Sequence, residues 1–297
     1  SSDVCSSDLP HLWVQFPHTV FAALTTGSFF VLGISAYHML KKSKEDWIKA
    51  SFKISLLVAI ISTILVAGLG DAQGKYLVKN LPMKMAAAEA LWETKDPAPL
   101  DVVAVIDEKN KKNTFEIGIP KLLSFMSFSK FNGKVEGIKE IQTQYVQKYG
   151  PGNYIPPVTL SFYSFRLMVG SGIVMLLISF VGLYFYKKRN IYSQTKLLKL
   201  MVVSIALPYI ANSTGWILTE VSRTPWIVFG LLKLDNAFSP TVSAGYVLTS
   251  LIVFTLLYLV LIVIDIRLMV KFIKKTPIDN NSTKINKNNS EEESLWI

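Results

Sequence analysis

The chain has 297 residues, of which 51% are hydrophobic and 18% are charged, and its formal net charge is +10. Its mean hydropathy of +0.37 is too high for a soluble domain with a polar surface, so several membrane spans are expected. The basic residues stand beside apolar runs instead of forming one patch, which argues against nucleic-acid binding. A single cysteine, Cys5, excludes a disulfide framework and a thiolate metal site.

The two ends of the chain are set apart by composition. The first nine residues, Ser-Ser-Asp-Val-Cys-Ser-Ser-Asp-Leu, form a near-duplicate around one cysteine and resemble adaptor-derived sequence, so residues 1–9 are left out of the fold prediction. Because no methionine opens the chain, we expect it to begin inside a longer protein. Residues 272–297 turn polar and rich in Asn, Lys and Glu, and are expected to be disordered.

Five apolar segments are long enough to cross a bilayer as helices. With residues 12–40, 52–69, 159–186, 197–219 and 243–270 as spans, three basic clusters fall on one side of the membrane. The positive-inside rule assigns that side, and with it the C-terminus, to the cytoplasm. The predicted fold is therefore an all-α membrane bundle of five helices, two within residues 10–72 and three within residues 158–271.

Residues 73–157 are predicted to form one large extracytoplasmic loop. Asn80 can cap a helix and Pro82 suits a first helical turn, so residues 83–92 are predicted to be helical. Residues 109–113 are the predicted solvated tip of the loop.

Four polar or aromatic side chains share one helical face at the end of the fourth apolar segment. Asn212, Trp216, Glu220 and Arg223 follow one another at steps of four, four and three residues. Ionisable groups at the end of a membrane helix are costly and usually mark a site. The alternative is that Glu220 and Arg223 simply pair at the water interface.

His18 and Met168 are candidate axial ligands of a haem. His18 lies near the outer end of the first predicted span, and Met168 lies about nine residues into the third, counted from the same side. At ~1.5 Å per residue, their depths in the membrane are compatible. The alternatives are a hydrogen-bonded structural histidine and a methionine that fills the core.

Three further ionisable residues are candidates for a site. Arg166 lies well inside the third span, where it needs an anion: a haem propionate, or an acidic residue of another helix. Lys84 and Glu89 stand about 140° apart around the predicted loop helix, so they would flank a groove instead of pairing. The alternative for Lys84 and Glu89 is a pair of solvated surface charges.

Taken together, four motifs resemble subunit I of the cytochrome bd quinol oxidases over about residues 10–270. The motifs are Phe16-Pro17-His18-Thr19-Val20 followed by Leu32-Gly33-Ile34-Ser35-Ala36, then Pro82-Met83-Lys84-Met85-Ala86-Ala87-Ala88-Glu89, then Ser164-Phe165-Arg166-Leu167-Met168-Val169-Gly170, and Gly215-Trp216 through Glu220 with Ser222-Arg223-Thr224-Pro225-Trp226. The last resembles the family's Gly-Arg-Gln-Pro-Trp signature, with Ser222 and Thr224 replacing Gly and Gln. Complete subunits resemble a nine-span protein, so this chain would be the C-terminal part of a short-loop member.

The resemblance implies a role for each candidate residue. His18 and Met168 would ligate the iron of a low-spin haem b, with Arg166 beside it. Glu220 would ligate a high-spin haem, haem b in preference to haem d, with Arg223 and Trp216 at the same site. Lys84 and Glu89 would act in quinol oxidation.

The implied activity is that of a quinol:oxygen oxidoreductase of the bacterial inner membrane. Quinol would be oxidised at the outer loop, and electrons would pass through the low-spin haem to a haem b and haem d pair that reduces oxygen to water. This would generate a proton gradient without pumping, and the implied partners are subunit II and a small accessory membrane subunit. The fragment alone is expected to be inactive.

Two other classes of protein would explain some of these residues. One is a proton-coupled transporter with Arg166 and Glu220 in its binding site. The other is a haem-bearing membrane anchor of a quinol dehydrogenase, which would lack an oxygen site.

Overall fold

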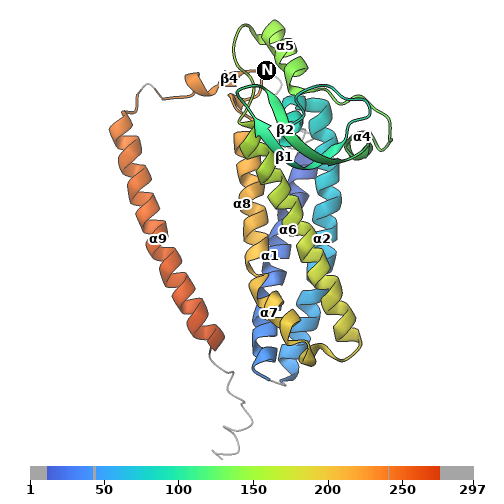
Figure 1. Ribbon diagram of the computed structural model, residues 1–297. Coiled ribbons are helices and arrows are strands. Elements are labelled where there is room, and N and C mark those ends of the chain that lie inside the picture. Colours follow the sequence, from blue (N-terminus) through green and yellow to red (C-terminus); the bar gives the residue numbers. More distant parts are fainter. Residues whose placement is uncertain (1–11, 43–44, 240, 275–297) are drawn as a thin grey trace, which may run out of the picture. The chain divides into compact units, whose positions relative to one another are not determined.

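The computed structural model describes residues 12–42, 45–239 and 241–274 (Figure 1). The chain divides into two compact units, Ser1–Phe238 and Ser239–Ile297, which are described separately. The predictions for residues 1–9 and for the tail beyond Lys274 fall outside the described residues.

The first unit is built on long apolar helices, four of the five spans that the described residues contain. Helix α1 (Leu12–Leu40) packs along α2 (Asp46–Asn80), and α6 (Val158–Lys187) packs along a span divided into α7 (Thr195–Val203) and α8 (Ala206–Val221). Figure 1 shows these helices running side by side as a bundle. We call the end of this bundle that carries residues 81–157 the loop end.

Two spans differ from the prediction. Helix α2 continues to Asn80, so the loop begins at Leu81 and not at residue 73. The fourth span is interrupted between α7 and α8, where the Leu207 amide donates to the Ser204 carbonyl in a tighter turn at 3.1 Å. Pro208 has no amide hydrogen to donate to that carbonyl, which explains why the regular helix breaks there.

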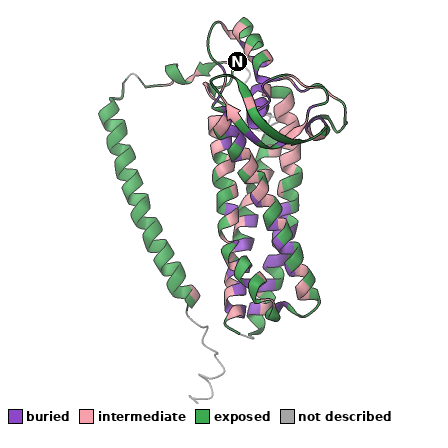
Figure 2. Cartoon of the chain, viewed as in Figure 1, coloured by how far each residue is buried: buried purple, intermediate pink, exposed green. Residues whose placement is uncertain are grey.

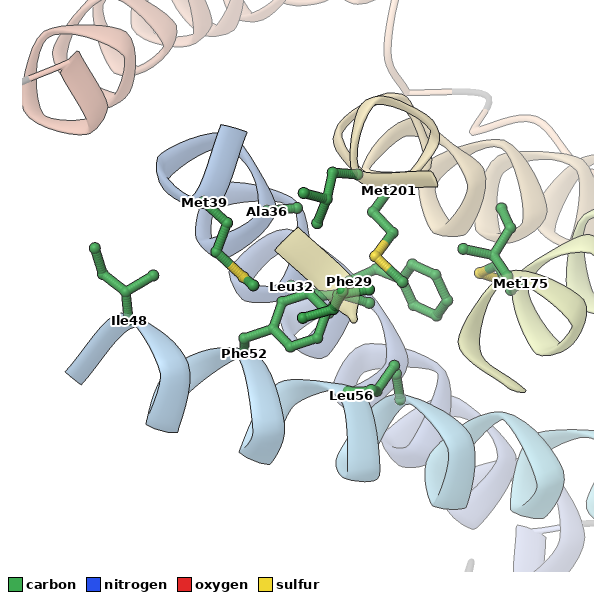
Figure 3. Packing of buried hydrophobic residues seen from close by; sticks show 13 residues of the cluster. Phe29, Leu32, Ala36, Met39, Ile48, Phe52, Leu56, Met175 and Met201 are labelled. Carbon is green, nitrogen blue, oxygen red and sulfur yellow. The ribbon is translucent and has the colours of Figure 1, made fainter. Parts of the chain in front are cut away.

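The core of the bundle lies toward the end remote from the loop. Phe29 and Leu32 of α1 meet Phe52 of α2 and Met201 of α7, and all four are fully buried (Figure 3). Gly33 allows a close approach here, because an added Cβ would stand 2.3 Å from the Ile205 side chain. Small residues that let helices approach closely are typical of packing between membrane helices.

The loop contains both helices and strands. Its elements are α3 (Pro82–Ala88), β1 (Leu100–Asp107), β2 (Lys112–Ile119), α4 (Leu122–Phe128) and α5 (Ile138–Tyr149). The predicted loop helix is present, but it ends at Ala88. Asn80 does not cap it, since the side-chain amide of Asn80 donates back to the Tyr76 carbonyl. The antiparallel β1–β2 hairpin, with its turn at the predicted tip, was not predicted.

A second apolar cluster fixes the loop to the bundle. Met83 of α3, Tyr145 of α5 and Tyr154 are buried with Phe162 of α6 and Trp226. Trp226 is the first residue of a short strand pair, β3 (Trp226–Val228) and β4 (Leu232–Lys233). Its ring stacks on the Tyr154 ring with 5.7 Å between the ring centres. Figure 2 shows this buried zone beneath the hairpin. The loop is therefore packed onto the helix ends.

The second unit contains helix α9 (Ala244–Lys274), an apolar helix of 31 residues. Its length and composition suit a membrane span, as predicted for residues 243–270. The helix extends to Lys274, so the prediction of a disordered tail from residue 272 is wrong for residues 272–274.

Candidate functional site

Arg166 is bonded to the loop through a buried ion pair. Its Nη2 donates to Glu89 Oε2 at 2.6 Å, and its Nε donates to the Asp101 carbonyl at 2.7 Å. The guanidinium carbon also lies 4.4 Å from the centre of the Phe162 ring. The structure thus contains the acidic partner that the sequence offered as the alternative anion, while contact with a haem propionate remains a prediction.

Glu89 follows α3 and is only 2% exposed. Burial raises the pKa of the Glu89 carboxyl, and the nearby Arg166 charge opposes that shift. Among the described residues, Glu89 Oε1 has no hydrogen-bond partner although it is buried. This carboxylate can therefore accept one more hydrogen bond or a proton.

Lys84 points to a different helix from Glu89. Its ammonium donates to the Thr219 carbonyl of α8 at 3.3 Å. Burial, followed by the positive charge of Arg223, lowers the pKa of Lys84 to about 8. Lys84 and Glu89 do not pair with each other, as predicted, and neither is a freely solvated surface charge.

Glu220, on the last turn of α8, forms an ion pair with Arg223, which lies in the turn that follows the helix. Their side chains are 35% and 45% exposed, and Trp216 on the same face is 67% exposed. Asn212, the fourth member of the face, donates to the Thr26 hydroxyl of α1 at 2.9 Å. Asn212, Trp216 and Glu220 thus share a face of α8 as predicted, whereas Arg223 lies beyond the helix end and meets this face through its ion pair with Glu220.

A cavity of about 260 Å³ opens at the loop end between α3, α5, α8 and the segment that follows α8. Lys84, Arg223, Tyr145 and Trp226 contribute to its wall. Trp226 Nε1 is buried without a hydrogen-bond partner among the described residues. Since ligand pockets commonly measure ~300–1,000 Å³, this cavity suits a ring-sized group.

His18 and Met168 each lie against a glycine of a neighbouring helix. A Cβ added to Gly70 of α2 would stand 3.4 Å from His18 Cε1, and one added to Gly215 of α8 would stand 2.9 Å from Met168 Sδ. His18 Nδ1 is buried without a partner among the described residues. A partnerless imidazole nitrogen and a thioether beside glycines fit the donor set of a low-spin haem, although here the two residues face different helices.

Sequence reasoning missed Tyr145 and Asp101. Burial raises the pKa of the Tyr145 hydroxyl to about 12, so this cavity residue stays a neutral hydrogen-bonding group. The spacing of Ile138, Ile141 and Tyr145, which are buried on one face of α5, was the available signal. Asp101 acts through its backbone carbonyl, which no sequence pattern reveals.

The apolar helices and the ionisable cluster at one end of them define an integral membrane protein with a polar site at the loop end. The chain belongs to the cytochrome bd terminal oxidase subunit I family, whose sequence model matches residues 8–277. It is 43% identical over 267 residues to cytochrome bd ubiquinol oxidase subunit 1 of Bacillus subtilis (strain 168), covering 90% of this chain and 57% of that protein. It is 27% identical over 321 residues to cytochrome bd-II ubiquinol oxidase subunit 1 of Escherichia coli (strain K12), covering 89% and 62%.

A solved structure gives the same result for the fold. The chain is similar to the bd oxidase from Geobacillus thermodenitrificans with a TM-score of 0.78 and 27% identity, covering 90% of this chain and 59% of that one. The chain thus spans about three fifths of the length of the proteins that it matches. These findings confirm the predicted family and the helical membrane fold.

Proposed function

We propose that this chain is part of the subunit of a terminal oxidase that oxidises quinol and passes the electrons to oxygen. The observation that carries the proposal is the contact of Lys84 with Thr219, the residue that precedes Glu220. A lysine expected at the quinol site therefore touches the helix end expected at a haem site. Gln15, three residues before His18, lines the same cavity as Lys84, so the proposed quinol site also lies near the low-spin haem that would receive the electrons.

The cavity beside Lys84 is the proposed site of the quinol ring. The Lys84 ammonium would donate a hydrogen bond to a quinol oxygen, and the rings of Tyr145 and Trp226 would border the quinol ring. Glu89 would accept a proton released from quinol, because one of its oxygens is partnerless and burial raises its pKa. Arg166 would hold the Glu89 carboxylate in position through their 2.6 Å contact.

His18 and Met168 would hold the low-spin haem b, and Glu220, with Arg223 and Trp216 beside it, would hold a high-spin haem b next to haem d. When bound, these haem groups would supply one-electron transfer and the reduction of oxygen to water. Glu220 would need only to leave its exposed contact with Arg223 to act as an anionic ligand. Arg223, in the turn beyond the helix end, would compensate its charge.

The setting of the proposed activity is the bacterial inner membrane. The loop would be extracytoplasmic and the C-terminus cytoplasmic, which agrees with the basic residues near Lys41, Lys187 and Lys271. Protons released outside and taken up inside would generate a gradient without a pump. Subunit II and a small accessory membrane subunit are the proposed partners, and the 297-residue chain alone would not reduce oxygen.

Met168→Leu tests the haem assignment, because it preserves volume and removes the sulfur donor. In the whole oxidase complex, the low-spin signal of the reduced-minus-oxidised spectrum should be lost or become high-spin. Met175→Leu is the matched control, since Met175 lies on the same helix within the apolar core and should leave the spectrum unchanged. An unchanged spectrum in Met168→Leu would contradict the assignment.

The same preparation separates the other classes of protein. A Soret band argues against a transporter. A red-shifted haem d band together with quinol-driven oxygen uptake separates an oxidase from a membrane anchor of a dehydrogenase.

A further inference from the structure

The β1–β2 hairpin carries an apolar face that is directed away from the protein. In β1, Ala104 is fully buried, whereas its neighbours Val103 and Val105 are 46% and 52% exposed. Val105 pairs with Phe115 of β2, and Val103 pairs with Ile117, so the exposed side chains of the two strands lie next to one another. We define the hairpin outer face as Val103, Val105, Phe115, Ile117 and Ile119.

This face has the wrong polarity for contact with water. A hairpin with one solvated side normally alternates buried apolar residues with exposed polar ones. Here the large apolar residues of β2 are exposed, Phe115 by 54% and Ile117 by 56%, and Figure 2 shows exposure along nearly the whole strand. A contiguous exposed apolar surface usually marks a contact with membrane or protein.

The hairpin is fixed to the first turns of α6. The Thr159 amide donates to Glu108 Oε1 at 2.7 Å, and the Tyr163 hydroxyl donates to the Ala104 carbonyl at 2.8 Å. One turn further along α6, Arg166 donates a third hydrogen bond, to the Asp101 carbonyl of β1. The hairpin therefore lies beside residues 159–166 of a membrane-spanning helix.

The length of α6 sets the level of the hairpin relative to the bilayer. At ~1.5 Å per residue, a helix of 30 residues is about 45 Å long. A bilayer is about 40–45 Å thick with its headgroups and about 30 Å without them. The first turns of α6, and the hairpin bonded to them, thus coincide with the lipid headgroup layer.

Lysines stand at both ends of the hairpin outer face, and the acidic residues at the turn, Asp107 and Glu108, are bonded to Asn110 and Thr159. Lys109, Lys111 and Lys112 are exposed in and beside the turn, and Lys121 is exposed just after β2. Glu116, the acidic residue of β2, is paired with Lys95 at 3.1 Å. An apolar face rimmed by lysines is complementary to acyl chains below and phosphate groups around it.

We propose that the hairpin outer face rests in the lipid headgroup layer, with Phe115 and Ile117 against the upper acyl chains and the lysines of the turn at lipid phosphates. The hairpin then anchors the loop to the bilayer surface as well as to α6. This membrane contact does not depend on the proposed oxidase activity.

Spin labels at adjacent positions of β2 test the proposal. Ile117→Cys places a label on the outer face, and Glu116→Cys is the matched control on the opposite face of the same strand. Both are made in the whole complex with its native cysteines, including Cys5, replaced by serine, and reconstituted in vesicles that contain phosphatidylglycerol. Collision of each label with oxygen, which concentrates in lipid, is compared with collision with a water-soluble nickel chelate.

The label at residue 117 should collide more with oxygen than with nickel, and the label at residue 116 should show the reverse. Replacing Lys111 and Lys112 with Gln should shift the label at residue 117 toward nickel. Collision mainly with nickel at residue 117 would overturn the proposal in favour of water. Protection from both reagents would overturn it in favour of a protein partner on this face.

Discussion

The two arginine–glutamate pairs at the loop end have the same chemistry in opposite surroundings. Arg166 and Glu89 are 77 residues apart in the sequence and are 16% and 2% exposed. Arg223 and Glu220 are three residues apart at the C-terminal end of α8, with Arg223 in the turn after the helix, and are 45% and 35% exposed. The first pair connects the loop to α6, and the second lies on the surface at the end of α8.

Burial decides what each pair can do. Removing one partner of a buried pair leaves an uncompensated charge, at a cost of about 3–5 kcal/mol, whereas an exposed pair contributes about 0–1 kcal/mol. Glu220 and Arg223 can therefore separate at small cost and take a ligand. Arg166 and Glu89 cannot separate cheaply, so we interpret Arg166 as a positioning residue for Glu89.

The largest expected effect follows from breaking the buried pair. Arg166→Gln should lower the free energy of unfolding by about 3–5 kcal/mol, because Glu89 remains buried without its cation. Arg223→Gln is the matched control and should lower it by about 0–1 kcal/mol. Unfolding of the detergent-solubilised complex, followed by tryptophan fluorescence, measures both, and equal losses would remove the distinction between the pairs.

A smaller loss of unfolding free energy is expected when the glutamate of the buried pair is replaced. Glu89→Gln keeps an oxygen that can accept from Arg166 and should cost about 1–3 kcal/mol. Quinol-driven oxygen uptake should slow while the haem content stays constant, because an amide cannot accept a proton. Kinetics identical to the native enzyme would show that Glu89 has only a structural role.

The exposed pair should show the opposite combination of effects. Glu220→Gln should change the free energy of unfolding by only about 0–1 kcal/mol, yet one high-spin haem signal should be lost from the spectrum. Retention of the full signal would contradict the proposed role of Glu220 as an iron ligand.

The smallest expected effect is on the titration of Lys84. The pKa of Lys84 is lowered to about 8, so its ammonium deprotonates, and the KM for quinol should rise, as the pH increases through about 8. Arg223→Gln removes a repelling charge and should move this rise to higher pH. Lys79→Gln, on the exposed end of α2, should leave the profile of KM against pH unchanged.

The sequence by itself determined the membrane spans and the family. A long apolar run that is helical leaves no backbone polar group without a hydrogen bond in lipid, so length and composition are sufficient to predict α1, α6 and α9. The end of α2 was missed because Gly70 and Asp71 suggested a stop. In the structure, Asp71 pairs with Lys75 one turn later at 2.7 Å, and the helix continues beyond the apolar segment.

Two local signals were present in the sequence but were not used. Pro208 could have predicted the break between α7 and α8, because it removes one helical hydrogen bond. The valine- and isoleucine-rich segments 100–107 and 112–119, separated by a polar turn, could have predicted the β1–β2 hairpin.

The tertiary structure alone decided which charges meet. Arg166 needed an anion in any fold, but sequence could not choose between a cofactor and Glu89, because partners 77 residues apart are brought together only by packing of the loop. The same packing directs Lys84 toward α8 and buries it near Arg223, and both effects lower its pKa. Local sequence sets which groups are present, and long-range packing sets their distances and their exposure to water, on which electrostatic energies depend.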